Sequence, residues 1–213
     1  MTKRISELRK EYHAASLDEQ FIKTDPLSQF LDWFNESMES EIEEPNAMVL
    51  STSDFNGNVS ARVVLLKGIE TGGFVFFTSY QSNKGIQLKT NPKAALTFHW
   101  HALERQVRVE GKVKRLSRRA SVEYFNSRPF DSRVSACVSP QSTVIPDRAF
   151  LQSMKEGLLL DLHGLPPLCP DNWGGYCLKP TMAEFWQGRV HRLHDRIRYR
   201  LHNKQWIIER LAP

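Results

Sequence analysis

The chain has 213 residues, of which 40% are hydrophobic and 25% are charged, a balance typical of a packed globular protein and not of a disordered chain. No apolar run approaches the roughly 18 residues that a membrane-spanning helix needs, and the N-terminus lacks the apolar stretch of a secretory signal. Three cysteines cannot all pair within one chain, so a disulfide framework is not expected. These features predict a soluble, cytoplasmic protein of one large domain or two small ones.

Charge is unevenly distributed along the chain, although the net charge is only +5. Residues 1–46 hold five Lys/Arg against eleven Asp/Glu, whereas residues 84–119 hold ten against two and residues 181–213 hold seven against three. A basic middle and tail can bind nucleic acid, a membrane surface or small phosphorylated ligands. They can equally form a solvated face, which is the commonest meaning of such a bias. Composition alone leaves these alternatives open.

The first predicted element is a helix that begins at Pro26. Asp25 is a suitable N-cap, proline fits the first helical position, and apolar residues follow at helical spacing, namely Leu27, Phe30, Leu31, Phe34 and Met38. No repeat, low-complexity tract or Gly/Ser linker interrupts the chain. We therefore predict an N-terminal helical extension over residues 1–46 and a single functional domain over residues 47–213.

From residue 47 the apolar periodicity changes to that of strands. Asn56-Gly57 lies between the strand-like stretches 48–52 and 59–66 and predicts a hairpin whose two central residues both have positive φ. Further strands are predicted over residues 74–78, 94–100, 106–116, 173–178, 184–186, 192–201 and 206–211, and helices over residues 82–90, 117–126 and 146–160. Many short strands with inserted helices predict a mainly β fold, an antiparallel barrel, and not a doubly wound sheet.

Motifs for several common chemistries are missing. The chain has no Gly-x-Gly-x-x-Gly, phosphate-loop or Gly-x-Ser-x-Gly motif, and Gly174-Gly175 alone fits a tight start of a strand better than a phosphate site. His191 and His194 are three residues apart and His99 and His101 two apart, but neither pair has further ligands at metal-binding spacing. We expect no metal site.

Cationic residues among polar and aromatic neighbours are the more informative candidates. A strand in the tail would place Arg192, His194 and Arg196 on one face, where three cations repel one another unless an anion lies among them. On spacing alone, a solvated edge strand is the favoured interpretation. Arg62 and Lys67 flank an apolar strand with opposite parity. Either the strand bends, or the two cations bind different anions. A third alternative is that both lie at the rim, with their aliphatic chains along the surface and their charges in solvent.

Two further groups have ordinary structural explanations. Gln106, Arg108 and Glu110 share one face of a predicted strand, and an ion pair within the strand accounts for the last two. Tyr124 and Arg128 are four residues apart at the end of a predicted helix, a spacing typical of a helix-surface contact.

Several stretches, in order and over nearly the whole chain, resemble the pyridoxamine 5′-phosphate oxidase family. The most specific runs from Glu184 to Arg196 and contains Trp186 and the sequence Arg-Leu-His-Asp-Arg at residues 192–196. Supporting stretches lie at residues 46–48, 62–67, 105–111, 127–129 and 141–142. The resemblance implies a split β-barrel that forms a homodimer, with FMN bound in clefts between the subunits.

By position, the resemblance implies two sets of site residues. The FMN contacts are Arg62, Val63, Val64, Leu65, Phe77, Thr78, Lys84, Gln106, Gln141, Ser142, Trp186 and Arg196. The substrate contacts are Lys67, Tyr124, Arg128, Ser132, Arg192 and His194, and the last two are the catalytic candidates because they would orient the pyridine ring. Such a site holds two phosphates, and charge-assisted hydrogen bonds are the strong way to hold them. Of the two cations that flank the strand at residues 62–67, one would bind the FMN phosphate and the other the substrate phosphate.

The implied reaction is FMN-dependent oxidation of the 4′ carbon of pyridoxamine or pyridoxine 5′-phosphate by dioxygen, giving pyridoxal 5′-phosphate and hydrogen peroxide. The implied partners are a second copy of the chain and small phosphorylated pyridines, with neither nucleic acid nor membrane. The alternatives are a related split-barrel flavin-binding protein or reductase with another substrate, and a non-enzymatic binder of nucleic acid or of pyridoxal phosphate.

The chain departs from the family pattern at three positions. Asn83 precedes Lys84 where an arginine is usual near the FMN phosphate, Ala183 replaces a larger aliphatic residue, and Pro140 precedes Gln141 where a basic residue is common. The first departure is expected to weaken one phosphate contact, because an amide cannot make a bidentate charge-assisted bond. The other two predict only local packing or loop variation.

Overall fold

The computed structural model describes residues 11–13, 15–70 and 72–213, so residues 1–10 and 14 of the predicted extension lie outside the described part. Within it the strands are β1 (Ala47–Ser53), β2 (Val59–Leu65), β3 (Gly68–Glu70), β4 (Gly73–Ser79), β5 (Lys93–Trp100), β6 (Arg105–Arg115), β7 (Trp173–Gln187), β8 (Asp195–His202) and β9 (Gln205–Arg210). The helices are α1 (Pro26–Glu39), α2 (Asn83–Thr90), α3 (Arg118–Ser127), α4 (Phe130–Val138) and α5 (Arg148–Leu162).

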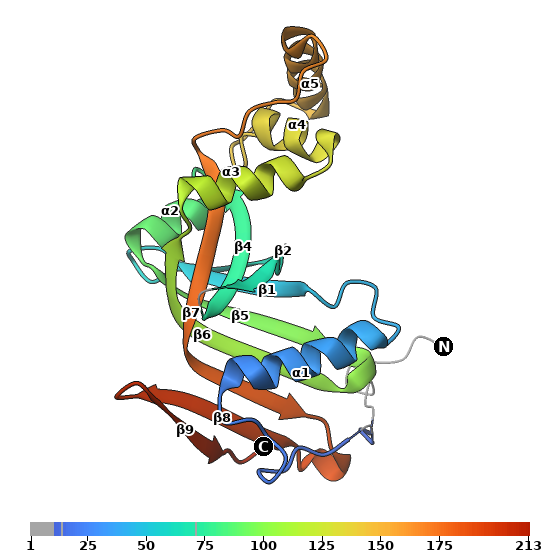
Figure 1. Cartoon of the computed structure of the whole chain (residues 1–213), viewed down its shortest axis with the longest axis vertical. Coiled ribbons are helices and arrows are strands. Elements are labelled where there is room, and N and C mark those ends of the chain that lie inside the picture. Colours follow the sequence, from blue (N-terminus) through green and yellow to red (C-terminus); the bar gives the residue numbers. More distant parts are fainter. Residues whose placement is uncertain (1–10, 14, 71) are drawn as a thin grey trace.

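The strands form one curled antiparallel sheet, in the order β2-β1-β5-β6-β7-β4-β3, and β8 and β9 continue from the second half of β7. Figure 1 shows α3, α4 and α5 gathered at one end of the long axis and β8 and β9 at the other, with β7 running between them. The predicted mainly β split barrel with inserted helices is confirmed. No helix in the described ranges is both long and apolar enough to cross a bilayer.

Side-chain caps explain where most helices begin. The Asp25 carboxylate accepts hydrogen bonds from the backbone N–H groups of Leu27 and Ser28 at the start of α1, and Ser82, Ser117 and Asp147 cap α2, α3 and α5 in the same way. α4 was not predicted, because Pro129 caps it without a side-chain hydrogen bond and only a short break separates it from α3. β3 was also missed, since three residues are too few to show a period.

The core lies between α1 and the inner face of the sheet (Figure 1). Phe30 and Trp33 of α1 are buried, and the Phe30 ring centroid lies 4.8 Å from those of Phe74 and Phe98. Fully burying a phenylalanine contributes about 1.5–3 kcal/mol, so these contacts fix α1 against the sheet. In β6 the alternation is as predicted, with Val107 and Val109 buried and their polar neighbours on the outer face.

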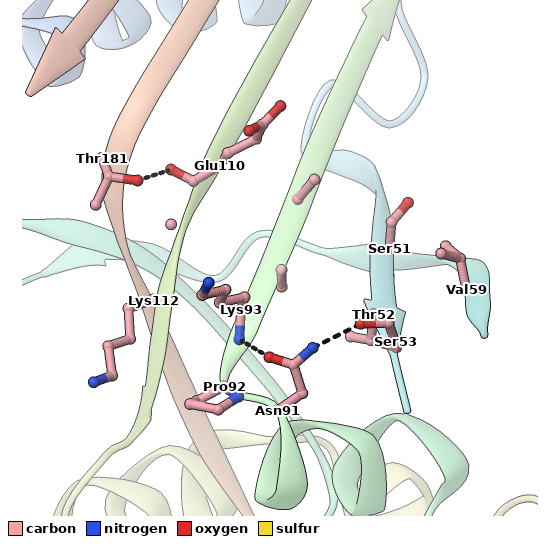
Figure 2. A pocket seen from close by; sticks show the side chains of 13 residues that line it. Ser51, Thr52, Ser53, Val59, Asn91, Pro92, Lys93, Glu110, Lys112 and Thr181 are labelled. Carbon is pink, nitrogen blue, oxygen red and sulfur yellow. Dashed lines mark hydrogen bonds between the residues drawn. The ribbon is translucent and has the colours of Figure 1, made fainter. Parts of the chain in front are cut away.

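β7 corrects one prediction, because the separate strands expected at residues 173–178 and 184–186 are a single strand of 15 residues. Pro180 lies within this strand, although proline cannot donate to a ladder. It is accommodated at a bulge: Gly111 pairs with Pro180 and Glu110 with Met182, which leaves Thr181 as the extra residue. The Thr181 hydroxyl donates to the Glu110 carbonyl at 3.3 Å (Figure 2). A Cβ on Gly111 would lie 2.1 Å from the Lys179 carbonyl oxygen, so the close approach of β6 and β7 at the bulge requires glycine.

One turn prediction and one strand prediction were wrong in detail. Of Asn56-Gly57, only Gly57 has positive φ, because the connection is a longer loop in which the Asp54 carboxylate accepts from the Asn58 backbone N–H. The strand predicted from residue 192 begins at Asp195. Arg192 instead ends a short 3₁₀ turn with a φ of 62°. Arg192 and His194 therefore precede β8 and do not follow the alternation of a strand.

Candidate functional site

A cleft of about 610 Å³ lies where β2, β4 and the start of α2 meet α3 and α4. Two thirds of the predicted site residues line it, namely Arg62, Val63, Val64, Leu65, Lys67, Phe77, Thr78, Lys84, Tyr124, Arg128, Ser132 and Gln141. Sequence reasoning missed Pro129, Ser135, Ala136, Ser139 and Trp173, which also line it. The serines at 132, 135 and 139 follow helical spacing, a signal that could have revealed the lining face of α4.

Four cations line this cleft without an acidic partner. They are Arg62, Lys67, Lys84 and Arg128, and no aspartate or glutamate is among the lining residues. In the described part of the chain, none of the four forms an ion pair within 4.0 Å. Cations gathered in this way repel one another, and an anion among them removes that cost. The cleft therefore has the electrostatics of an anion-binding site.

Neutral partners orient two of these cations. Arg62 Nη1 donates to the Leu50 carbonyl at 3.1 Å and to Thr52 Oγ1 at 2.6 Å. Lys84 Nζ donates to Thr78 Oγ1 at 3.2 Å and to Ser82 Oγ at 3.3 Å. Burial lowers the pKa of Lys84, and the nearby charge of Arg62 lowers it further. Both side chains are thus held in place while their charges remain uncompensated.

Arg128 carries a buried donor that has no partner among the described residues. Its Nη1 is buried and makes no hydrogen bond, and its guanidinium lies 4.9 Å from the centroid of the Trp173 ring. Burial is the main cause that lowers the pKa of this guanidinium. An unsatisfied buried donor costs about 1–3 kcal/mol, which a ligand oxygen bound at this position would recover.

Stacked aromatic rings form one wall of the cleft. The rings of Phe77 and Tyr124 are 3.8 Å apart with an interplanar angle of 18°, and Trp173 is stacked with Phe77 at 5.5 Å. Gly175 pairs with Phe77 across the sheet, and a Cβ there would lie 2.8 Å from the Phe77 ring. The small residue at the start of β7 therefore makes room for the ring stack.

Arg62 and Lys67 reach the same cleft despite their opposite parity. β2 ends at Leu65, and the chain then turns so that the Lys67 backbone N–H donates to the Val75 carbonyl of β4 at 2.8 Å. The chain therefore changes direction between the two cations, which matches the bend that was one of the alternatives left open by the sequence. Tyr124 and Arg128, which resembled a surface pair, also line the cleft.

Six predicted site residues do not line the cleft. Ser142 follows Gln141 and is exposed, with a φ of 69°. The remaining five belong to a second cluster at the β8 end of the sheet, made of Gln106, Trp186, Arg192, His194 and Arg196. Gln106 and Trp186 are cross-strand neighbours, as are Trp186 and Arg196, and the His194 ring centroid lies 4.7 Å from that of Trp186.

Local contacts define the chemistry of this second cluster. His194 Nδ1 accepts a hydrogen bond from the Arg189 backbone N–H at 3.1 Å, so the neutral ring carries its proton on Nε2. Burial lowers the pKa of His194, as does Arg192, whereas Asp195 raises it. Arg196 Nε donates to the buried Glu184 carboxylate at 2.8 Å. His194 is therefore a neutral donor at neutral pH, beside a cation.

Within one copy of the protein, the cleft and the second cluster lie at opposite ends of β7. Trp173 lines the cleft and Trp186 belongs to the second cluster, and they lie at the two ends of β7 (Figure 1). At about 3.3 Å per residue, the strand between them is roughly 40 Å long. A single small ligand cannot contact both ends, so one copy of the chain holds only part of the predicted site.

Another cavity, of about 650 Å³, lies on the sheet beside the end of α2 (Figure 2). Its charged lining residues are Lys93, Lys112 and Glu110, which have mixed sign. None of the predicted site residues lines it. The cationic cleft therefore remains the candidate site.

The curled sheet and the cationic cleft define a class, the split-barrel proteins with a cleft suited to an anion. Residues 34–156 match the family model described as Pyridoxamine 5′-phosphate oxidase. Residues 173–213 match the one described as Pyridoxine 5′-phosphate oxidase C-terminal dimerisation region. The chain belongs to the pyridoxamine 5′-phosphate oxidase family.

Curated relatives match over the full length. The pyridoxine/pyridoxamine 5′-phosphate oxidase of Polynucleobacter asymbioticus is 51% identical over 98% of this chain and 99% of the relative. The protein of the same name from a Cyanothece species is 49% identical over 100% of both chains. Among solved structures, PhzG from Burkholderia lata, in complex with tetrahydrophenazine-1-carboxylic acid, has a TM-score of 0.87 and 26% identity, and the match covers 91% of this chain and 95% of PhzG.

A more distant structure supports the fold alone. An FMN-binding protein from Nostoc punctiforme, described as related to pyridoxamine 5′-phosphate oxidase, has a TM-score of 0.71 at 19% identity, over 89% of this chain and 98% of its own.

Proposed function

We propose that the protein oxidises pyridoxamine and pyridoxine 5′-phosphate to pyridoxal 5′-phosphate, with FMN as cofactor and dioxygen as the final electron acceptor, and releases hydrogen peroxide. The observation that carries this proposal is the cleft with four uncompensated cations, one of which has a buried donor without a partner. The pyridoxine/pyridoxamine 5′-phosphate oxidases that match over the full length at 51% and 49% identity support the same activity.

The residues of the cleft fit FMN and a second phosphorylated ligand. Arg62 and Lys84 would hold the FMN phosphate, since both are oriented by neutral partners and lie near enough for the charge of one to lower the pKa of the other. Thr78 and Gln141 add polar groups, with Thr78 Oγ1 lying 3.2 Å from Gln141 Oε1. FMN, when bound, would accept two electrons from the substrate carbon and deliver them to dioxygen.

The other cations would hold the substrate. Lys67, Tyr124, Arg128 and Ser132 would bind its phosphate, which anchors the non-reacting end and reduces the entropy cost of alignment. Each hydrogen bond to a charged group contributes about 1.5–3 kcal/mol. Arg192 and His194 would orient the pyridine ring, with the Nε2–H of His194 as a donor. No residue has to act as a nucleophile.

A homodimer would complete the site. Because the cleft and the second cluster lie at opposite ends of one chain, Gln106, Trp186, Arg192, His194 and Arg196 would reach a cleft only from a second copy. The match of residues 173–213 to a dimerisation region supports this arrangement, since that segment contains β8 and four of the five residues.

The spectrum and the product test this proposal. We expect the purified protein to be yellow with non-covalent FMN, and to produce hydrogen peroxide when pyridoxamine 5′-phosphate is added. A colourless protein that does not bind added FMN in a fluorescence titration contradicts the cofactor. A flavin-containing protein that oxidises neither phosphorylated pyridine would instead favour a related split-barrel flavoprotein with another substrate.

A further inference from the structure

Two of the three cysteines lie close together behind the wall of the cleft. Cys137 belongs to α4 and Cys169 to the segment that precedes β7, and both are half-buried. Cys137 Sγ lies 3.6 Å from the carbonyl oxygen of Leu168, the residue before Cys169. Because a carbonyl oxygen lies within about 3 Å of the next Cα, the Cys137 sulfur is already beside the Cys169 backbone. Cys169 Sγ lies 3.8 and 4.0 Å from the carbonyl oxygens of Pro170 and Trp173, so its side chain has to turn toward Cys137 to reach disulfide geometry.

The surroundings of the two thiols differ. Burial raises the pKa of both, but Cys169 Sγ also accepts a hydrogen bond from Arg118 Nη1 at 3.3 Å, which favours its thiolate. Arg128 lowers the pKa of both thiols, and Asp171 raises that of Cys169. The thiolate is the reactive form, and Cys169 is the thiol that has a guanidinium donor beside it, so we assign the attack to Cys169 and the resolving step to Cys137.

We propose that Cys137 and Cys169 form a reversible disulfide when the protein meets hydrogen peroxide. The Cys169 thiolate attacks one peroxide oxygen, the O–O bond breaks, and a sulfenic acid and one water result. The Cys137 thiol then attacks this sulfur, the S–S bond forms, and the second water leaves. In total, two thiols and one peroxide give one disulfide and two waters, and two electrons pass from sulfur to oxygen. That the protein generates this oxidant itself rests on the proposed function, whereas the thiol pair does not.

The disulfide would act on the substrate side of the cleft. Cys137 lies on α4, which together with its C-cap Ser139 contributes Ser132, Ser135 and Ser139 to the lining. Cys169 lies on the segment that Arg118 holds through the carbonyls of Pro170 and Trp173, at 2.9 and 3.2 Å. A cross-link would tie these two walls together around Arg128, which packs on Trp173. Arg62 and Lys84 belong to other elements, so FMN binding should be spared.

Intact-mass measurement of the reduced, flavin-loaded protein tests the proposal. Treatment with graded peroxide should lower the intact mass by two hydrogen atoms. Alkylation afterwards should label one thiol of the three, and digestion should yield a peptide that links residues 137 and 169. Dithiothreitol should reverse the change. In Cys137→Ser the resolving thiol is absent, so a sulfenic acid should accumulate on Cys169 and react with dimedone. Cys177→Ala is the matched control and should still form the cross-link.

Several outcomes would overturn the proposal. Three alkylatable thiols after peroxide, a gain of oxygen atoms without a cross-link in the unmutated protein, or a link through Cys177 would each exclude the pair. The oxidised protein should show a KM for pyridoxamine 5′-phosphate at least threefold higher with unchanged FMN content, and Cys137→Ser should not. An unchanged KM in the cross-linked protein would exclude the coupling to the cleft. The mass assay needs no turnover, so a cross-link in an inactive protein would contradict only the proposed function.

Discussion

At the scale of the residue, Arg128 has the features of a proposed binding group that is kept at the expense of stability. Its buried Nη1 has no partner among the described residues, and its charge has no counterion within 4.0 Å there. Such a group stabilises a ligand by an amount that it does not contribute to the unliganded fold. Stability and substrate affinity should therefore respond to its removal in opposite directions.

Arg128→Met tests this separation. The free energy of unfolding without ligand should stay the same or rise by up to about 1 kcal/mol, because an unpaired cation is replaced by an apolar side chain of similar length. The KM for pyridoxamine 5′-phosphate should rise roughly ten- to hundredfold, as expected from the loss of about 1.5–3 kcal/mol. Denaturant unfolding and steady-state kinetics measure the two effects. Arg119→Met, at an exposed position of α3, is the control and should change neither.

The acid side of the pH profile should report on His194. Its pKa lies below the ordinary value of 6.5, chiefly because of burial. Protonation therefore favours the unfolded chain, and stability should decrease as the pH falls below about 6.5. A protonated Nδ1 can no longer accept from the Arg189 N–H, so kcat/KM should fall over the same range. His194→Gln should lower kcat/KM but remove this acid limb. An unchanged limb in the variant would assign it to another group.

At the scale of the element, the sequence predicted what local patterns determine. The caps at Asp25, Ser82, Ser117 and Asp147 set most helix starts, and strict alternation identified the core face of β6. The errors lie where tertiary pairing overrides the local signal. Pro180 is tolerated within β7 because the bulge removes its need to donate. Arg192 and His194 were assigned to a strand because alternation cannot detect the 3₁₀ turn that precedes β8.

The same reasoning applies to the site. The cations that line the cleft were identified as candidates from sequence, but their convergence depends on where β2 ends and on α4, neither of which a local pattern specifies. The grouping of Trp186 with His194 was anticipated only through the family resemblance. Residue spacing could not show that the cleft and the second cluster lie at opposite ends of β7, because their separation depends on the length and course of this strand.

The start of α2 offers a gain-of-affinity test. Asn83 is the first residue of α2, is exposed, and does not line the cleft. Asn83→Arg should tighten FMN binding about fivefold, or about 1 kcal/mol, because an arginine adds a charge-assisted bond and loses part of it to repulsion from Lys84 and Arg62. Dissociation constants at low and high salt measure the effect, which should shrink as salt screens the charge. Asn83→Gln is the control. Equal or weaker binding by the arginine variant at low salt would count against a role for this position.

At the scale of the whole molecule, the proposed site has a quantitative consequence for mixed dimers. Arg128→Met weakens the cleft and Arg192→Ala the second cluster, so each homodimer should have little activity at substrate concentrations well below KM. When equal amounts are dissociated and reassembled, half of the dimers are mixed, and each has one intact site of two. The mixture should therefore recover about a quarter of the original activity. If each chain built its own complete site, mixing would recover nothing.

The bulge at Thr181 determines how β7 can tolerate change. Trp173 and Trp186 are an odd number of residues apart, so a regular strand would point them to opposite faces. The one unpaired residue restores their common parity. Deleting Thr181 would remove one exposed hydroxyl, yet it would invert the second half of the strand, turning Phe185 outward and Glu184 toward the core. An insertion or deletion of one residue elsewhere in β7 would do the same. Length variation in the family should therefore be confined to the loops on either side of this strand.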